Sequence, residues 1–211
     1  MIFADRQDAG RQLAKALSAY QGRNPLILAI PRGAVPMGKT IAELLGGELD
    51  VVLVRKLTSP YSSEFALGAI DESGWAYIAD YAASAGGTPE YLEQEKQRQM
   101  ATLRERRAQY TPLHPPIDPA GRIVIIIDDG LATGSTMIAA LHATRAKKPA
   151  KLICAVPVSP PDTLEKIRPL CDELVCLHAP WDFRAVGQFY QDFNQVSDDE
   201  VIEILNHSSV G

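Results

Sequence analysis

The amino-acid sequence predicts an α/β fold with a central, mainly parallel sheet and helices on both of its faces. Apolar runs of strand length recur along the chain, and segments with apolar residues at helical spacing separate them. The run at 123–127 is apolar throughout, which is typical of a strand buried on both faces of a parallel sheet. The order strand, loop, helix, strand occurs twice, at 26–55 and at 123–158, as expected when helices connect parallel strands.

The first half of the chain contributes two helices and two strands to this fold. In chain order they are expected at 5–20 (helix), 26–30 (strand), about 36–45 (helix) and 50–55 (strand). Asp5 or Asp8 is placed to cap the first helix, and Gly46 stands where glycine commonly ends a helix.

An insertion is expected between the two halves, at about 57–119. Its turn residues predict a hairpin, a Thr-Pro pair predicts the start of a polar helix, and four prolines predict an extended spacer. These parts are expected as a polar loop at 57–66, a hairpin of 65–71 with 75–80, a helix at 88–110 and a spacer at 112–119. The polar loop is expected to be mobile and to close over a ligand site.

The second half repeats the pattern of the first. Strands are expected at 123–127, 152–156 and 175–177, with a helix at 137–146. The segment 179–211, called the hood here, is rich in aromatic residues at its beginning. We therefore expect a single domain, with a core at about 1–56 and 120–178, the insertion at 57–119 and the small C-terminal hood.

Composition indicates an ordinary globular protein. The chain has 211 residues, of which 46% are hydrophobic and 22% charged, and this is enough for a sizeable core. The net charge of −5 argues against broad nucleic-acid binding through a basic surface. No apolar run approaches the length that spans a bilayer, and three cysteines without metal-ligand spacing favour reduced thiols. We expect a cytoplasmic protein that binds neither membrane nor nucleic acid.

The most informative stretch follows the apolar strand at 123–127. Two adjacent carboxylates, Asp128 and Asp129, stand where ligands bind in open α/β sheets. The Gly/Ser/Thr loop at 132–136 then opens a helix, and its amides, its hydroxyls and the helix dipole suit a phosphate. Carboxylates beside a phosphate would repel it unless they hold sugar hydroxyls, Mg²⁺ or both. The sequence therefore predicts a site for a sugar phosphate.

The run from Asp128 to Thr136 resembles the phosphoribosyl-pyrophosphate (PRPP) signature of type I phosphoribosyltransferases. The resemblance implies that Asp128 and Asp129 are catalytic residues that hold the ribose hydroxyls. It implies that the 5′-phosphate lies on the loop made of Ala132, Thr133, Gly134, Ser135 and Thr136. Two positions depart from the pattern. Gly130 replaces a residue that is usually aliphatic, and Ala132 stands where several purine enzymes place an acid. The general acid or base therefore stays open, with Glu64 as one candidate.

The resemblance also assigns residues outside the signature. It implies a pyrophosphate site at Arg32, Gly33, Ala34 and Lys56, and an acceptor site under hood residues Trp181 and Phe183. It implies Mg²⁺ as the cofactor, held through PRPP without direct protein ligands, or through water on Asp128 or Asp129. The implied reaction moves the 5-phosphoribosyl group from PRPP to a nitrogen of a nucleobase-like acceptor and releases pyrophosphate, in nucleotide salvage. Many relatives are homodimers, so a homodimer is a further expectation.

Two other functions remain open on the sequence alone. A non-catalytic regulator that binds PRPP needs the same signature. Residues 33–40 also satisfy the spacing of a P-loop, which would indicate a kinase or NTPase using Lys39 and Thr40. Pro36 lacks an N–H donor and Val35 is β-branched, so both are poorly suited to a loop that wraps phosphates. The P-loop interpretation also leaves 132–136 without a role.

Overall fold

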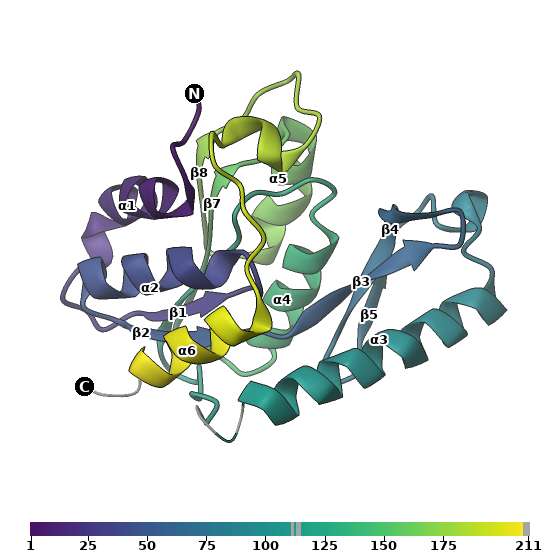
Figure 1. The fold of residues 1–211 in the computed structure, drawn as a ribbon, viewed down its shortest axis with the longest axis horizontal. Helices are drawn as coiled ribbons and strands as arrows, with labels where there is room; N and C mark the ends of the chain where they lie inside the picture. The colour runs from purple at the N-terminus through teal and green to yellow at the C-terminus, as the bar shows by residue number, and fades with distance from the viewer. Residues whose placement is uncertain (111, 113–114, 209–211) are drawn as a thin grey trace.

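The computed structural model describes residues 1–110, 112 and 115–208 and has the predicted α/β architecture (Figure 1). Five parallel strands form the central sheet in the order β2-β1-β6-β7-β8. In chain order the strands are β1 (Leu26–Ala29), β2 (Glu48–Val51), β6 (Ile123–Ile127), β7 (Lys151–Val158) and β8 (Glu173–His178). The strands expected at 26–30, 123–127, 152–156 and 175–177 are confirmed, with β7 and β8 longer than the sequence indicates.

Helices cover both faces of this sheet because alternate strand residues point to opposite sides. Ile125 and Ile127 of β6 pack in one buried cluster with residues of α1 and α2, whereas Val124 and Ile126 pack in another with residues of α4. The helices of this body are α1 (Arg6–Ala16), α2 (Ala34–Leu45), α4 (Ser135–Arg145), α5 (Pro161–Ile167) and α6 (Asp198–Ser208). Short 3₁₀ turns lie at η1 (Ser18–Tyr20), η3 (Arg168–Leu170) and η4 (Val186–Phe189).

The predicted insertion forms an arm that projects from the body (right in Figure 1). A three-stranded antiparallel sheet of β3 (Val54–Ser59), β4 (Ser62–Asp71) and β5 (Ala76–Ile78) is followed by the turn η2 (Ala83–Ala85). The long helix α3 (Pro89–Tyr110) then packs along this sheet. The hairpin and the helix are therefore confirmed, while the spacer expected at 112–119 lies partly outside the described residues.

Two details of the arm correct the sequence analysis. The single strand expected at 50–55 is two strands in different sheets, because β2 ends at Val51 and β3 begins at Val54. The polar loop expected at 57–66 is mostly a hairpin, in which β3 pairs with β4. The sequence of this hairpin is polar, as in a loop, because the strand ends near its turn are largely exposed and need no apolar face.

Backbone hydrogen bonds join the N-terminal segment to the hood segment. A parallel bridge joins Phe3 to Tyr190. The amide of Phe3 donates to the carbonyl of Phe189 (2.7 Å), and the amide of Gln191 donates to the carbonyl of Phe3 (2.8 Å). The hood segment is thereby held beside the start of α1, and α6 continues from it to pack on α2 (Figure 1).

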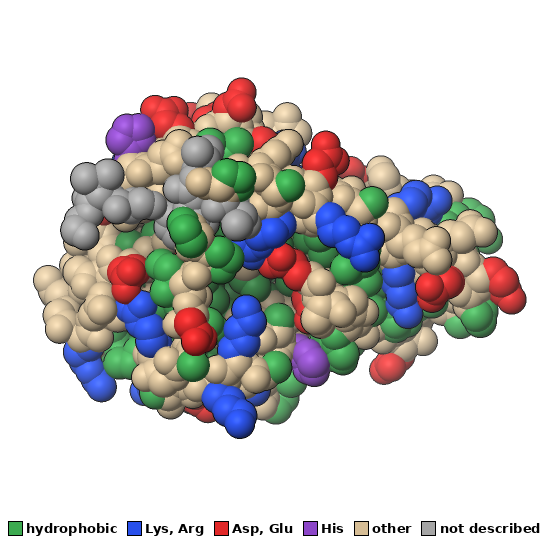
Figure 2. All heavy atoms as spheres, turned by 90° about the horizontal axis from the view of Figure 1, so that it is seen from below, with side chains coloured by type: hydrophobic (Ala, Val, Ile, Leu, Met, Phe, Trp, Pro, Cys, Tyr) green, Lys and Arg blue, Asp and Glu red, His purple; other side chains and the backbone are tan. Residues whose placement is uncertain are grey.

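The surface shows no single basic stripe on the face drawn in Figure 2, where Lys and Arg side chains are interspersed with Asp and Glu side chains. This agrees with the negative net charge of the chain. In the part of the chain that the structure describes, none of the helices combines the length and the apolar character needed to cross a bilayer.

Candidate active site

A cleft of about 630 Å³ opens at the carboxyl ends of β1 and β6, where open α/β sheets bind ligands. Most of the residues predicted for the site line it. They are Gly33, Lys56, Asp128, Asp129, Ala132, Thr133, Gly134, Ser135 and Thr136. Glu64 of β4, the candidate acid or base, also lines it. The fold thus brings the carboxylates, the Gly/Ser/Thr loop and a lysine from the arm together.

The two adjacent carboxylates have different surroundings. The Asp128 carboxylate accepts a hydrogen bond from the amide of Asp129 (2.8 Å). The Asp129 carboxylate forms an ion pair with Arg6, with 3.0 Å between Nε and Oδ2. Burial, and then the neighbouring charge of Asp129, raises the pKa of the Asp128 carboxyl well above its ordinary value, against the opposing charge of Lys56. Asp128 therefore carries a proton more readily than an exposed aspartate does.

This asymmetry predicts that Asp128→Asn stabilises the free protein at neutral pH. The pKa of the Asp128 carboxyl is higher in the folded state than in the unfolded state. Its contribution to stability is therefore fully present at pH values below the unfolded-state pKa, and it is lost as the pH rises through the folded-state pKa. Asparagine carries no charge to bury, so the urea midpoint of the variant should exceed that of the wild type at pH 7. The difference should shrink as the pH falls toward 4. A lower midpoint for the variant at pH 7 would contradict this account.

The loop at 132–136 is shaped by Gly134 and by the hydroxyl of Thr163, which belongs to α5. Gly134 adopts a left-handed conformation (φ 82°) directly before α4, and a Cβ there would lie 2.7 Å from Cγ2 of Thr163. The Thr163 hydroxyl donates to the carbonyl of Ala132 (2.7 Å), and the hydroxyls of Thr133 and Ser135 lie 3.1 Å apart. Thr133, Ser135 and Thr136 line the cleft at the N-terminus of α4, and hydroxyl residues at a helix N-terminus are suited to binding a phosphate.

Gly130 has a steric explanation that the sequence does not provide. A Cβ at this position would lie 2.6 Å from Cγ1 of Val186 and 2.9 Å from Cγ1 of Val158. An aliphatic residue, which the family pattern usually has here, would collide with the hood. Glycine therefore replaces the usual aliphatic residue at 130 because the hood packs directly against the loop that follows Asp128 and Asp129.

The pyrophosphate loop is only partly arranged as predicted. Gly33 and Lys56 line the cleft, but Arg32 and Ala34 are not among its lining residues, and Ala34 is fully buried. Arg32 lies instead within electrostatic range of Arg55, whose pKa is lowered by burial and then by the charges of Arg106 and Arg32.

The hood meets the cleft through residues other than the two predicted aromatics. Trp181 is 89% exposed and does not line the cleft, while Phe183 packs on Phe189 with 5.5 Å between ring centroids. The cleft is lined instead by Arg184, Ala185, Val186, Gly187 and Phe193. The aromatic content of 181–190 pointed to the right segment, but aromatic character alone does not indicate which side chains face a ligand.

The P-loop interpretation of 33–40 is wrong. Helix α2 begins at Ala34, so these residues form the first turns of a helix and not a loop around phosphates. Gly38 lies inside this helix, where a Cβ would collide with Cδ1 of Leu49 at 2.8 Å. This glycine is required for packing of α2 on the sheet, and Lys39 does not line the cleft.

Comparisons with known proteins point to one family. The family model of the phosphoribosyl transferase domain matches residues 3–192. Two candidate phosphoribosyl transferases of Mycobacterium tuberculosis, MT0597 (strain CDC 1551 / Oshkosh) and Rv0571c (strain ATCC 25618 / H37Rv), are each 40% identical to the chain over 210 residues. The alignment covers 98% of this chain and 47% of each relative, so the chain spans about half the length of these curated relatives.

A solved structure matches over nearly the whole chain. The crystal structure of TT1426 from Thermus thermophilus has 42% sequence identity and a TM-score of 0.81, covering 98% of this chain and 99% of that one. The family model thus covers the central sheet of this protein, Asp128 and Asp129, and the loop at 132–136. The chain belongs to the phosphoribosyl transferase family, as the run from Asp128 to Thr136 predicts.

Proposed function

We propose that the chain transfers the 5-phosphoribosyl group from PRPP to a nitrogen of a nucleobase-like acceptor and releases pyrophosphate. The observation that carries this proposal is the convergence of Asp128, Asp129, the loop at 132–136 and Lys56 on one cleft. The acid pair suits two sugar hydroxyls, the loop suits a phosphate monoester, and the lysine suits the charge of a leaving pyrophosphate. A non-catalytic regulator that binds PRPP would use the same contacts.

The proposed mechanism depends on positioning and charge. The C1–O bond of PRPP breaks as the acceptor nitrogen approaches, and positive charge develops on the ribose ring. Asp128 and Asp129 hold the 2′- and 3′-hydroxyls and place negative charge near that ring. The loop at 132–136 anchors the 5′-phosphate, so that C1 is held at a fixed place in the cleft. Lys56 stabilises the departing pyrophosphate.

The residues of the cleft fit Mg²⁺, the cofactor that the family implies. Carboxylate oxygens are suitable ligands, and Asp128 and Asp129 supply them at the ribose end of the cleft. Within the described ranges, no group of three or more His, Cys, Asp or Glu side chains is arranged to hold a metal ion. We therefore propose that the ion is held mainly through oxygens of PRPP and water, with Asp128 or Asp129 through water. When bound, it would neutralise charge on the pyrophosphate.

The test is isothermal titration calorimetry, in which PRPP is titrated into the protein in the presence of Mg²⁺. We expect saturable binding, and we expect Lys56→Gln to weaken it by about ten- to 100-fold because a charged contact contributes roughly 1.5–3 kcal/mol. Lys39→Gln is the matched control, since Lys39 lies outside the cleft, and it should leave PRPP binding unchanged. An absence of PRPP binding by the wild type would refute the proposed function.

A second measurement separates the enzyme from the regulator. Release of pyrophosphate from PRPP is followed while nucleobases are added one at a time. A base that accelerates release identifies the acceptor and supports the transferase. Tight PRPP binding without release across a broad panel of bases would support the regulator instead.

A further inference from the structure

Arg6 occupies a position at the start of α1 that local helix energetics disfavour. A cation in the first turn of a helix lies at the positive end of the helix dipole. Asp5 fixes this turn, because its carboxylate accepts the amide of Asp8 (2.7 Å), while the Asp8 carboxylate accepts the amide of Ala4 (2.9 Å). Arg6 is thus held at this place by caps on either side, and its charge needs a partner outside the helix.

The partner is the acid pair of the cleft. Nε of Arg6 lies 3.0 Å from Oδ2 of Asp129, and the two side chains are only 13% and 15% exposed. Both the Arg6 guanidinium and the Asp129 carboxylate also lie against Gly33 of the pyrophosphate loop. A Cβ built on Gly33 would be 2.3 Å from Asp129 Oδ2 and 3.1 Å from Arg6 Nη2. Arg6 therefore fixes the direction of the Asp129 carboxylate at the place where the loop after β1 meets the loop after β6.

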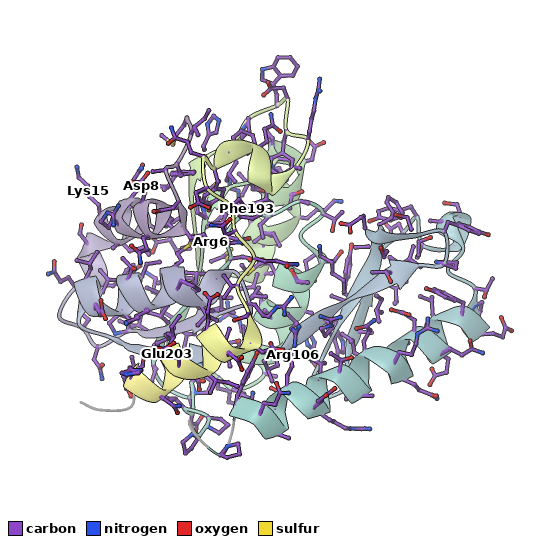
Figure 3. The ribbon with its side chains drawn as sticks, in the orientation of Figure 1. Arg6, Asp8, Lys15, Arg106, Phe193 and Glu203 are labelled. Atoms are coloured by element: carbon purple, nitrogen blue, oxygen red, sulfur yellow. The ribbon has the colours of Figure 1, made fainter. Side chains whose placement is uncertain are left out.

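The same guanidinium holds the hood. Nη1 of Arg6 donates to the carbonyl of Asn194 (2.5 Å), and Cζ lies 4.1 Å from the centre of the Phe193 ring. Figure 3 shows Arg6 and Phe193 next to each other beside the start of α1. The two segments run side by side up to the start of α1, because Phe3 pairs in parallel with Tyr190 and the amide of Asp192 donates to the carbonyl of Ala4 (3.0 Å), and this brings Arg6 close to Phe193.

A second contact ties the hood to the same acid. The hydroxyl of Tyr190 donates to the backbone carbonyl of Asp129 (2.6 Å), and the ring of Tyr190 packs on Phe3 and Phe193. Asp129 is therefore held through its side chain by Arg6 and through its backbone by Tyr190. Both holding residues belong to the paired N-terminal and hood segments.

We propose that Arg6 is a positioning residue for PRPP binding, which holds the Asp129 carboxylate in its binding orientation against the hood. This inference rests on the proposed function, since it assigns Asp129 to the ribose hydroxyls. Two neighbouring carboxylates repel each other, so without a cation Asp129 would turn away from Asp128 and out of line with the sugar. Arg6 acts on PRPP only through Asp129, and its contacts with Asn194 and Phe193 hold the guanidinium in place.

The charged groups around the pair are the other cleft residues. Lys56 acts on Asp128 from β3, and Glu64 and Arg184 line the same cleft from β4 and the hood. Lys56 supplies positive charge from the arm, and Arg184 supplies it from the hood itself. Of these three cations, Arg6 is the one that forms an ion pair with Asp129 and also contacts Asn194 and Phe193 of the hood.

The test is a double-mutant cycle on PRPP affinity, measured by calorimetry with Mg²⁺. Arg6→Gln should weaken PRPP binding by about tenfold, the size expected for a coupled, largely buried pair. In the Asp129→Asn background, which removes the anionic partner, Arg6→Gln should change the affinity by less than about twofold. Arg6→Lys keeps the charge and loses the planar fork, so its affinity should fall between those of the wild type and Arg6→Gln.

Arg11→Gln is the matched control, because Arg11 lies on the same helix with its side chain 57% exposed. It should leave PRPP affinity unchanged. Equal losses from Arg6→Gln in both backgrounds would show a general structural role and overturn the inference, while the proposed function would stand if the wild type binds PRPP. If the wild type does not bind PRPP, the proposed function fails first. Should Arg6→Gln not fold, Arg6→Lys carries the same cycle.

Discussion

Asp129→Asn is expected to weaken PRPP binding by about 100-fold and also to lower the free energy of unfolding. The carboxylate contributes charge-assisted hydrogen bonds to the ribose in the proposed complex, each worth roughly 1.5–3 kcal/mol. Its loss also leaves the Arg6 guanidinium, which is only 13% exposed, without its anionic partner. Leaving a largely buried donor without its partner costs the desolvation of that group, so the unfolding free energy should fall by roughly 1–3 kcal/mol. Calorimetry with PRPP and urea unfolding at pH 7 measure the two effects.

The neighbouring acid provides the comparison for this prediction. Asp128→Asn should also weaken PRPP binding, yet it should raise the urea midpoint at pH 7, because burial raises the pKa of the Asp128 carboxyl. Asp199→Asn, at an exposed position on α6, should change neither quantity. Equal stability changes for Asp128→Asn and Asp129→Asn would show that the two carboxylates are equivalent, contrary to their different contacts.

Local patterns were sufficient to predict the sheet. A five-residue apolar run such as 123–127 has few alternatives to a buried strand, and the alternating order fixes the class. The break after Val51 could not be predicted in this way. Residues 51–54 form one apolar run, but Val51 belongs to the central sheet and Val54 to the arm. Which sheet a strand joins depends on its partners, and those are distant in the sequence.

The site was predictable where its chemistry is local and unpredictable where it is not. Asp128, Asp129 and the loop at 132–136 are contiguous, so their shared location follows from one strand and one helix. Arg6 enters the site only because the segment around Phe3 pairs with the segment around Tyr190, near the other end of the chain. No periodicity of either segment indicates this pairing. The one signal was an arginine in a first turn that otherwise favours acids.

Gly33→Ala is expected to weaken PRPP binding by about 100-fold while lowering the free energy of unfolding by less than Asp129→Asn does. The backbone of Gly33 is in the ordinary helical region (φ −58°, ψ −35°), so alanine meets no conformational strain. Its Cβ, however, would lie 2.3 Å from Oδ2 of Asp129, and the carboxylate would have to move by about 1 Å to restore normal contact. A misplacement of this size costs about 100-fold where geometry determines binding and catalysis.

Gly46→Ala is the control with the opposite profile. Gly46 ends α2 in a left-handed conformation (φ 66°) with open space around its Cβ direction, and it lies outside the cleft. Alanine there should cost roughly 1–2 kcal/mol of stability and leave PRPP affinity unchanged. Urea unfolding and PRPP calorimetry on both variants test the contrast. If Gly33→Ala binds PRPP as tightly as the wild type, the Asp129 carboxylate does not need the place against Gly33 that it occupies here, and its assignment to the ribose fails.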